Sequence, residues 1–313
     1  MYARTAPPRP FAHHAVAAVA ALCALTGAVR AQDALVTTDW VAKNAANPKV
    51  RVVEVSVDPG VYEKGHVPGA IGLKWHTELC DPVARDILTA AKFEELCSRS
   101  GIANDSTVVL YGDNSNWFAA WAVWTFTMYG HQDIKVMNGG RTKWEAEGRP
   151  WDTMVPAPTP TKYKVAGENK ALRARLADVL KVVEGQQPAV LVDVRSPDEY
   201  SGKVVAPAGI QELAIRSGHI PGAKSVTWKK AVNDDGTFKS VEELKKIYAE
   251  AGVDGSKPVI CYCRIGERSS HTWFVLKFLL GYDARNYDGS WTEYGNAVGV
   301  PIVNQAGSVW TGK

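Results

Sequence analysis

Short apolar runs, rich in β-branched residues, alternate along the chain with longer amphipathic segments. The runs have the length and composition of buried strands. They lie at 50–55, 107–111, 189–194 and 258–262. Buried strands that alternate with helices across short loops are typical of a parallel sheet with helices on both faces. The pattern therefore predicts the α/β fold class.

Two of the expected helices have clear ends. Ser240 followed by Glu243 forms a capping box that opens a helix, and Gly252 ends it. A second helix is expected over 268–280, and Gly281 ends that one. Both helices follow apolar runs in the second half of the chain, as the strand–helix alternation requires.

The chain contains two copies of one series of segments. Residues 65–70 (GHVPGA) recur as 218–223 (GHIPGA), 153 positions later, and five further matches follow in the same order. These pairs are 75 with 228, 52–55 with 191–194, 93–96 with 241–244, 109–113 with 259–263, and 138–142 with 288–292. The offsets drift from 139 to 153, which indicates an insertion of about 14 residues in the second copy, within 201–216.

The repeat predicts two tandem domains. The first copy covers 40–150 and the second covers 175–302. Residues 151–174 join them, and three prolines within 155–164 predict an extended linker there. Each domain is large enough to bury a core of its own without disulfide bonds.

Charge is balanced over most of the chain. The formal net charge of +3 comes from residues 1–31, which hold three arginines and no acidic residue. Without them, 33 Lys and Arg face 33 Asp and Glu. A neutral body argues against a nucleic-acid-binding protein, which needs a basic face to release counterions from phosphates.

The N-terminus resembles a secretory signal. An apolar run of about 15 residues follows a basic segment and precedes Val29-Arg30-Ala31. The run is too short for a membrane span, which needs roughly 20 apolar residues. We therefore expect a signal peptide at 1–31, cleaved after Ala31; an uncleaved N-terminal anchor is the alternative. The mature protein is expected to be exported, to the periplasm in a Gram-negative source, with no membrane partner.

Four cysteines remain beyond the signal: Cys80, Cys97, Cys261 and Cys263. This number is too small for a disulfide framework, and a Cys80–Cys97 bridge is left open. No Cys or His pair has structural-zinc spacing, so neither a metal nor another cofactor is expected.

Cys263 is the candidate nucleophile. It ends the strand at 258–262, and Arg264, Gly266 and Arg268 follow it before the helix. A short loop between a parallel strand and a helix points backbone N–H groups and the positive end of the helix dipole at one spot. A thiol at that spot is expected to shift toward thiolate. Cys261, inside the strand, is expected to be a core thiol.

The first copy has Asp113 at the position of Cys263. A carboxylate does not provide the nucleophilic sulfur of a thiol, and both loop arginines are missing there. We therefore expect the N-terminal domain to be a non-catalytic copy that packs beside the active one.

These motifs resemble those of tandem-domain rhodanese-type sulfurtransferases. The resemblance rests on the two Gly-His-x-Pro-Gly-Ala segments, the Cys-Arg-Ile-Gly-Glu-Arg loop at 263–268, and Tyr-Asp-Gly-Ser-Trp at 287–291, and it spans nearly all of 40–302. The closest likeness is to thiosulfate sulfurtransferases with this loop.

The resemblance implies a ping-pong reaction. A Cys263 thiolate takes the outer sulfur of thiosulfate, releases sulfite and passes the sulfur from a persulfide to a thiophilic acceptor such as cyanide. Arg264, Gly266, Arg268 and Ser269 would bind the donor. A protein acceptor of sulfur is left open.

Two further residues of the second copy are weaker candidates, Arg195 and Trp291. Family members from vertebrates carry a substrate-binding Arg where this chain has Glu199. An Arg195–Glu199 ion pair is the expected consequence, with a structural role for Arg195. Trp291 follows the Asp-Gly-Ser segment and is expected to approach the site.

Three other functions compete. Sulfurtransferases specific for 3-mercaptopyruvate have Gly and then Ser or Gly after the Cys, whereas Arg264 favours a dianionic inorganic donor. Phosphatase loops follow Cys-x5-Arg, and residues 263–268 are Cys-x4-Arg. A non-enzymatic persulfide carrier would use the same Cys263, so the sequence does not separate it from an enzyme.

Overall fold

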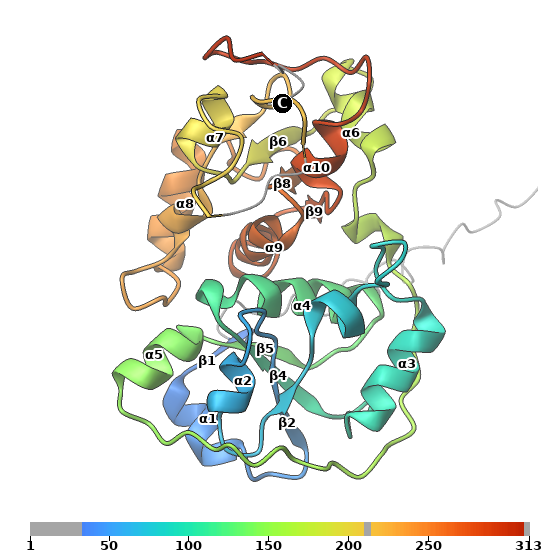
Figure 1. Cartoon of the computed structure of the whole chain (residues 1–313), viewed down its shortest axis with the longest axis vertical. Helices are drawn as coiled ribbons and strands as arrows, with labels where there is room; N and C mark the ends of the chain where they lie inside the picture. Colours follow the sequence, from blue (N-terminus) through green and yellow to red (C-terminus); the bar gives the residue numbers. More distant parts are fainter. Residues whose placement is uncertain (1–32, 210–213, 310–313) are drawn as a thin grey trace, which may run out of the picture.

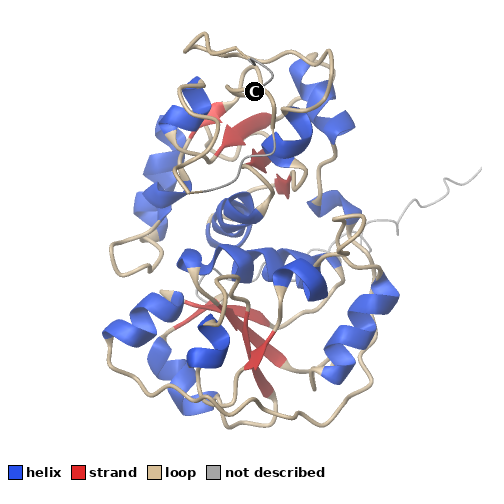
Figure 2. Ribbon diagram, in the orientation of Figure 1, coloured by secondary structure: helices blue, strands red, loops and turns tan. Residues whose placement is uncertain are grey.

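The computed structural model describes residues 33–209 and 214–309, and the expected signal peptide at 1–31 lies outside these residues. The chain forms two α/β domains, one in blue to green and the other in yellow to red (Figure 1). Helices surround the strands of each domain (Figure 2). No helix within the described ranges has the length and apolar character needed to cross a membrane.

Each domain has one fully parallel sheet. The first has the order β1-β5-β4-β2-β3 and the second β7-β6-β8-β9. The strands of the first are β1 (Leu35–Val36), β2 (Val50–Glu54), β3 (Ile71–Gly72), β4 (Thr107–Tyr111) and β5 (Ile134–Met137). Those of the second are β6 (Val190–Asp193), β7 (Lys224–Ser225), β8 (Val259–Tyr262) and β9 (Ala284–Asn286). Read from its other edge, the second sheet has the order β9-β8-β6-β7, and these strands correspond to β5-β4-β2-β3 of the first sheet. The matching order confirms the tandem repeat.

Helices cover both faces of each sheet. In the first domain they are α1 (Thr38–Asn44), α2 (Val61–Lys64), α3 (Ala90–Arg99), α4 (Trp117–Met128) and α5 (Gly140–Ala146). In the second they are α6 (Leu176–Val183), α7 (Pro197–Ser201), α8 (Val241–Glu250), α9 (Glu267–Phe274) and α10 (Ser290–Tyr294). Successive side chains of β4 point to opposite faces of the sheet. Val108 and Leu110 pack in the core on one face, and Val109 and Tyr111 pack in the core on the other. The predicted two-sided parallel sheet is confirmed.

Short helical turns complete the chain. Two are π-helical, η1 (Trp75–Leu79) and η5 (Val275–Leu279), and three are 3-10 turns: η2 (Asn114–Asn116), η3 (Lys170–Leu172) and η4 (Trp228–Ala231). The helix predicted over 268–280 is therefore α9 followed directly by η5. The capping box at Ser240 and Glu243 opens α8 as predicted.

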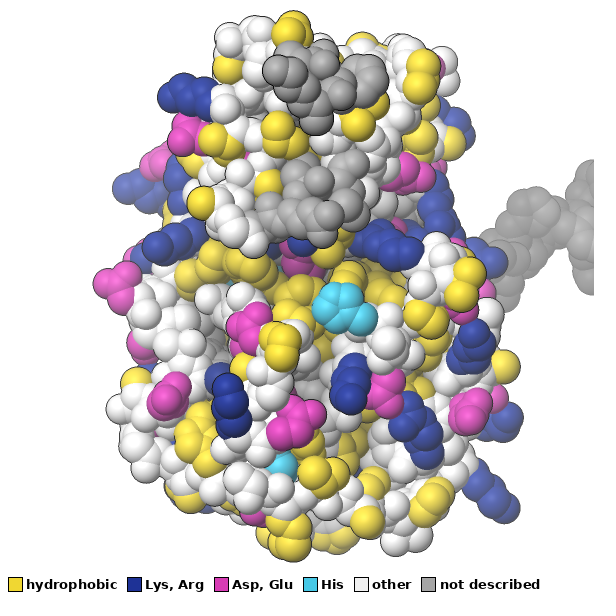
Figure 3. Space-filling view, in the orientation of Figure 1, with side chains coloured by type: hydrophobic (Ala, Val, Ile, Leu, Met, Phe, Trp, Pro, Cys, Tyr) yellow, Lys and Arg dark blue, Asp and Glu magenta, His cyan; other side chains and the backbone are white. Residues whose placement is uncertain are grey.

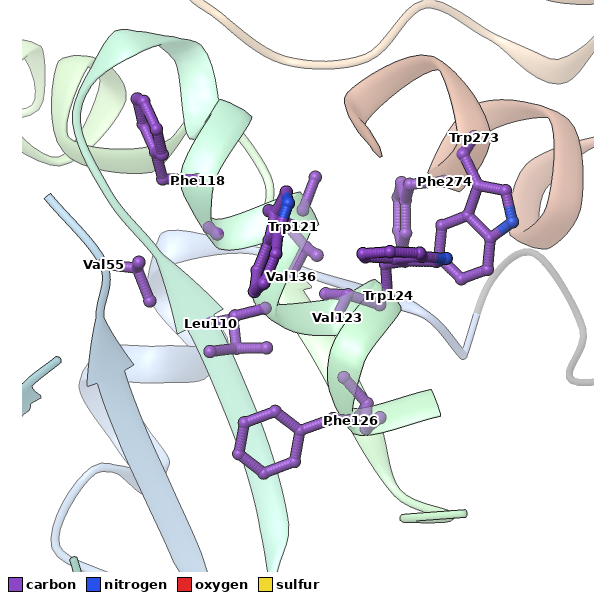
Figure 4. Packing of buried hydrophobic residues seen from close by; sticks show 14 of the residues in the cluster. Val55, Leu110, Phe118, Trp121, Val123, Trp124, Phe126, Val136, Trp273 and Phe274 are labelled. Carbon is purple, nitrogen blue, oxygen red and sulfur yellow. The ribbon is translucent and has the colours of Figure 1, made fainter. Parts of the chain in front are cut away.

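The domains share a core made by α4 and α9, which lie against each other between the two sheets (Figure 1). α4 is buried over nearly its whole length, because one side meets its own sheet and the other meets α9. Trp124 of α4 lies beside Trp273 and Phe274 of α9 (Figure 4). Trp117 and Trp228 extend the contact, edge to face at 4.7 Å between ring centroids. The helix that directly follows the turn of the candidate nucleophile is thus held by both domains.

Candidate active site

Cys263 lies in a four-residue turn, 263–266, between β8 and α9. Gly266 caps α9 with φ of +102°, and a Cβ there would come within 2.8 Å of the Asp288 Cα. Only glycine fits this backbone without strain. The turn places Cys263 at the amino end of α9, as the sequence predicted.

The turn holds the sulfur and its backbone in place. The Gly266 N–H donates to Sγ of Cys263 at 3.2 Å. The Cys263 N–H donates to Oγ of Ser290 at 3.0 Å, and the Trp291 N–H donates to the Cys263 carbonyl at 3.0 Å. The start of α10 therefore fixes the backbone of the candidate nucleophile.

The Cys263 thiol is not shifted toward thiolate, and that expectation was wrong. The side chain is fully buried, and burial raises the pKa of the thiol, with the nearby Glu267 carboxylate as the second cause. Arg268 and Ser269 act in the opposite direction and do not outweigh them. The sequence indicated the cations of the loop but not the degree of burial, which dominates.

Glu267 contacts the sulfur directly. The Cys263 thiol donates to Oε2 of Glu267 at 3.3 Å, and Glu267 is itself buried. Glu267 is part of the loop motif at 263–268, but the motif alone does not indicate its contact with the sulfur. Its position directly after the cap Gly266, one residue into α9, was the available signal.

Arg268 is held by Glu199 of α7. Its guanidinium donates to both carboxylate oxygens, at 3.0 and 3.1 Å, and both side chains are buried. The expected Arg195–Glu199 ion pair was therefore wrong. Arg195 instead makes a bidentate pair with Asp193 and donates to the Gly218 carbonyl at 2.6 Å. Arg195 thus has the structural role that was expected of it, with a different carboxylate.

The backbone of Trp291 contacts Cys263, but its indole ring points away from the thiol. The indole belongs to the core on the other face of the sheet, whereas Cys263 belongs to the shared core. The ring lies 4.6 Å from the guanidinium of Arg195, and its N–H donates to the Arg216 carbonyl at 2.9 Å. Trp291 therefore supports the turn rather than facing the sulfur.

The remaining predicted site residues surround the turn. Ser269 is buried, and its hydroxyl donates to Oδ1 of Asn286 at 2.6 Å. Arg264 is half-buried, and the Thr292 N–H donates to its carbonyl at 3.0 Å. The fold thus brings Arg264, Gly266, Arg268 and Ser269 together around Cys263.

The N-terminal domain also reaches the turn, through the segment at 80–87. Arg85 donates to the carbonyls of Ile265 and Asp288, the latter at 3.0 Å. Arg173 of the linker donates to both Asp288 carboxylate oxygens at 2.7 Å and to Asp86 at 2.6 Å. Sequence reasoning missed these residues because they lie far from the loop along the chain.

A cavity of about 300 Å³ lies beside this network, between the domains. Its lining includes Arg85, Arg173 and Asp288, and Cys263 is not part of it. Lys and Arg side chains are also visible at the junction of the domains in Figure 3. The Cys263 side chain itself has no exposed surface.

The corresponding turn of the first copy has a different arrangement. Oδ2 of Asp113 accepts from the N–H groups of Val57 and Asp58, both at 2.9 Å. Burial raises the pKa of the Asp113 carboxyl despite these bonds. A carboxylate thus occupies the position of the thiol and binds neighbouring amides of its own domain.

The cysteines are free thiols in the described part of the chain. Cys80, Cys97, Cys261 and Cys263 are all buried and unbridged. Within the same residues, no group of three or more His, Cys, Asp or Glu side chains is arranged to hold a metal ion.

Comparison with known proteins identifies two copies of one family. The model of the rhodanese-like domain matches residues 37–147 and 176–297. The chain is 54% identical over 272 residues to the "Putative thiosulfate sulfurtransferase" of Mycolicibacterium smegmatis, covering 86% of this chain and 97% of that protein. It is also 54% identical over 277 residues to the "Sulfur carrier protein TtuD" of Thermus thermophilus, covering 87% and 96%.

A solved structure shares the fold. The anaerobic ergothioneine biosynthesis enzyme from Chlorobium limicola superposes with a TM-score of 0.74 at 24% identity, over 87% of this chain and 70% of that one. At this identity the likeness concerns the fold alone.

Proposed function

Because the chain belongs to the rhodanese family, whose chemistry is sulfur transfer, we propose that it moves sulfane sulfur from thiosulfate to a thiophilic acceptor through a persulfide on Cys263. The observation that carries the proposal is the turn at 263–266. Its Gly266 amide donates to the sulfur, and neither Arg264 of the turn nor Arg268 of α9 has a counterpart in the first copy. The high identity to a relative named for thiosulfate sulfurtransfer supports the same donor.

The reaction has two half-reactions. The Cys263 thiolate attacks the outer sulfur of thiosulfate, the S–S bond of the donor breaks, and sulfite leaves with the bonding electron pair. The enzyme then carries a persulfide anion, which the Gly266 amide is placed to stabilise. A nucleophile such as cyanide attacks the outer sulfur and restores the thiolate, with thiocyanate as product.

Two arginines favour a dianionic donor over a monoanion. Arg264 directly follows the nucleophile, and Arg268 lies within electrostatic reach of its sulfur. Glu199 neutralises part of the Arg268 charge, so Arg264 has the larger role in donor binding in this proposal. Thiosulfate is therefore expected to react faster than 3-mercaptopyruvate.

The test is a thiosulfate:cyanide assay on purified protein with two single substitutions. Cys263→Ser should lose thiocyanate formation, and Cys261→Ser should keep it, because Cys261 lies inside β8 as a core thiol. Loss in the Cys261 variant alone contradicts the assignment. Parallel kinetics with 3-mercaptopyruvate decide the donor, and a larger kcat/KM for that substrate refutes the thiosulfate proposal.

A second function, persulfide carrier, is favoured by the relative that is named a sulfur carrier protein. A carrier would load sulfur on Cys263 and release it to a protein acceptor rather than to a small molecule. Mass spectrometry separates the two functions. A Cys263 persulfide that cyanide and small thiols do not discharge supports the carrier.

The remaining sequence predictions complete the proposal. The N-terminal domain at 40–150 is non-catalytic, with Asp113 in place of the nucleophile, and the segment at 1–31 directs export. A cysteine introduced at Asp113 is expected to stay inactive, because the loop arginines are missing. Fractionation of the source cells and N-terminal sequencing of the protein test the export signal, and cytoplasmic protein with an intact N-terminus refutes it.

A further inference from the structure

The thiol of Cys263 is buried and donates a hydrogen bond to Glu267, so a thiolate can form there only if a nearby group accepts the proton. Resting on the proposed function, we propose that Glu267 takes the proton of the Cys263 thiol and keeps it throughout the catalytic cycle. The loop motif implies the nucleophile and the donor-binding arginines, and it does not assign a proton acceptor.

The geometry supports direct proton transfer. The thiol donates to Oε2 of Glu267 at 3.3 Å, within the range of a hydrogen bond to sulfur. Both side chains are buried, and the Gly266 N–H approaches Sγ as a second partner. The proton therefore has a short path from sulfur to carboxylate that does not pass through water.

Another titratable side chain of α9, His271, does not fit this role. Its ring stacks on Phe238 at 4.7 Å and meets Trp228 edge to face, on the side of α9 that faces the domain interface. Neither ring nitrogen has a hydrogen-bond partner. His271 therefore has no described contact with the sulfur.

The charged side chains nearest to the pair are themselves held in ion pairs. Nε of Arg268 lies 3.7 Å from Oε1 of Glu267, and Glu199 of α7 neutralises the same guanidinium. Asp288, beyond β9, lies next to Gly266 and is paired with Arg173.

Two more cations border the turn. Arg85 of the N-terminal domain lies at the outer side of the turn, on the carbonyl of Ile265. Arg264, inside the turn, follows the nucleophile directly. The proton transfer leaves the net charge of the pair unchanged and moves the negative charge from the carboxylate to the sulfur, toward the Gly266 N–H.

The steps balance without another reactant. The S–H bond breaks and an O–H bond forms on Glu267, giving a thiolate beside a neutral carboxyl. The thiolate then takes the outer sulfur of thiosulfate, and sulfite leaves with the electron pair. Cyanide removes that sulfur and restores the thiolate, so the proton on Glu267 is neither consumed nor released in a turnover.

Retention of the proton explains how a carboxylate can lie in a site for an anion. A charged Glu267 would repel a dianionic donor and a persulfide anion. The neutral carboxyl can instead donate a hydrogen bond to the sulfur. Glutamine mimics this neutral form in shape and in donor capacity, but it cannot accept the thiol proton.

The test is a titration of the Cys263 thiolate by its ultraviolet absorbance, measured as the difference from Cys263→Ser. If the two groups share one proton, the thiolate absorbance of the wild type should rise in two steps with pH. Between the steps it should stay constant at about a tenth or more of its final value. Glu267→Gln should give one step without a plateau, and Glu267→Asp, which keeps an acceptor, should retain two. The exposed Glu242→Gln in α8 is the matched control and should behave as wild type.

Sulfur-transfer kinetics give an independent readout. Across the plateau, the wild-type kcat/KM should be flat with pH, whereas that of Glu267→Gln should change about tenfold per pH unit below its single step. A single step in the wild type, or a plateau that survives in Glu267→Gln, overturns the proposal. Two steps in a protein that turns over no sulfur donor would refute the proposed function and leave the proton acceptor in place. Melting temperatures of the variants establish that each is folded.

Discussion

His271 is expected to make the protein sensitive to acid. Its ring is fully buried with both nitrogens unpartnered, and burial lowers its pKa from the ordinary 6.5 to about 3. Unfolding exposes the ring, which then takes up a proton at any pH below about 6.5. The stability is therefore complete above about pH 6.5 and falls as the pH drops toward 3.

The magnitude follows from the two pKa values of His271. Each pH unit between them costs about 1.4 kcal/mol of unfolding free energy, so the loss from about pH 8 to about pH 5 is roughly 2 kcal/mol. His271→Leu removes the titrating group at similar volume. The variant should therefore lose roughly 2 kcal/mol less than the wild type over this range.

Urea unfolding followed by tryptophan fluorescence at both pH values measures this difference. Packing changes caused by the leucine are present at both pH values, so they cancel when the two losses are compared. The exposed His76→Leu is the matched control and should keep the wild-type loss. Equal losses in the wild type and His271→Leu refute the reasoning, because they would mean that the buried imidazole keeps its proton.

Three other substitutions test the turn and its partners. Gly266→Ala should lower the free energy of unfolding in urea by roughly 2 kcal/mol more than Gly281→Ala does. Both glycines have a positive φ, but only the Cβ added at Gly266 would collide with backbone atoms, those of Asp288. Glu199→Gln should lose about 3–5 kcal/mol at neutral pH, since it leaves a buried arginine unpaired. Burial opposes ionisation of Glu199, yet hydrogen bonding to that arginine lowers its pKa, so this stability is present above pH 4.5 and lost on acidification. The Gln variant should lack that acid dependence. Arg85→Ala should lower kcat/KM for sulfur transfer about tenfold, by freeing the turn, with a similar melting temperature. Lys143→Ala, which breaks an ion pair to the other domain away from the turn, should not change kcat/KM; equal effects of the two contradict a specific role for Arg85.

Local sequence patterns were sufficient to predict the elements and the position of the nucleophile. The β-branched runs became β2, β4, β6 and β8 within one or two residues, since their burial on both faces needs continuous apolar sequence. The repeat predicted two similar α/β domains, and the structure shows that their strand orders correspond. The glycine and the strand–turn–helix pattern placed Cys263 at the amino end of α9, because backbone geometry in a short turn depends on adjacent residues.

Long-range packing decided the electrostatics of the site. Glu199 is 69 positions from Arg268, Arg173 is 115 from Asp288, and Arg85 is 180 from Ile265. No local pattern indicates which charges meet across such separations. The expected Arg195–Glu199 pair failed because Glu199 binds the distant Arg268, while Arg195 binds Asp193, two positions away along the chain.

The environment of the Cys263 thiol also depends partly on local sequence and partly on tertiary packing. The sequence determined which residue is the thiol, which cations follow it and where the helix begins. Only the tertiary structure determined that the two domains bury this thiol completely and that Glu267 turns its carboxylate toward the sulfur. Burial and the negative charge of Glu267 both raise the pKa of the thiol. Both depend on which residues surround the sulfur in three dimensions, and these come from distant parts of the chain.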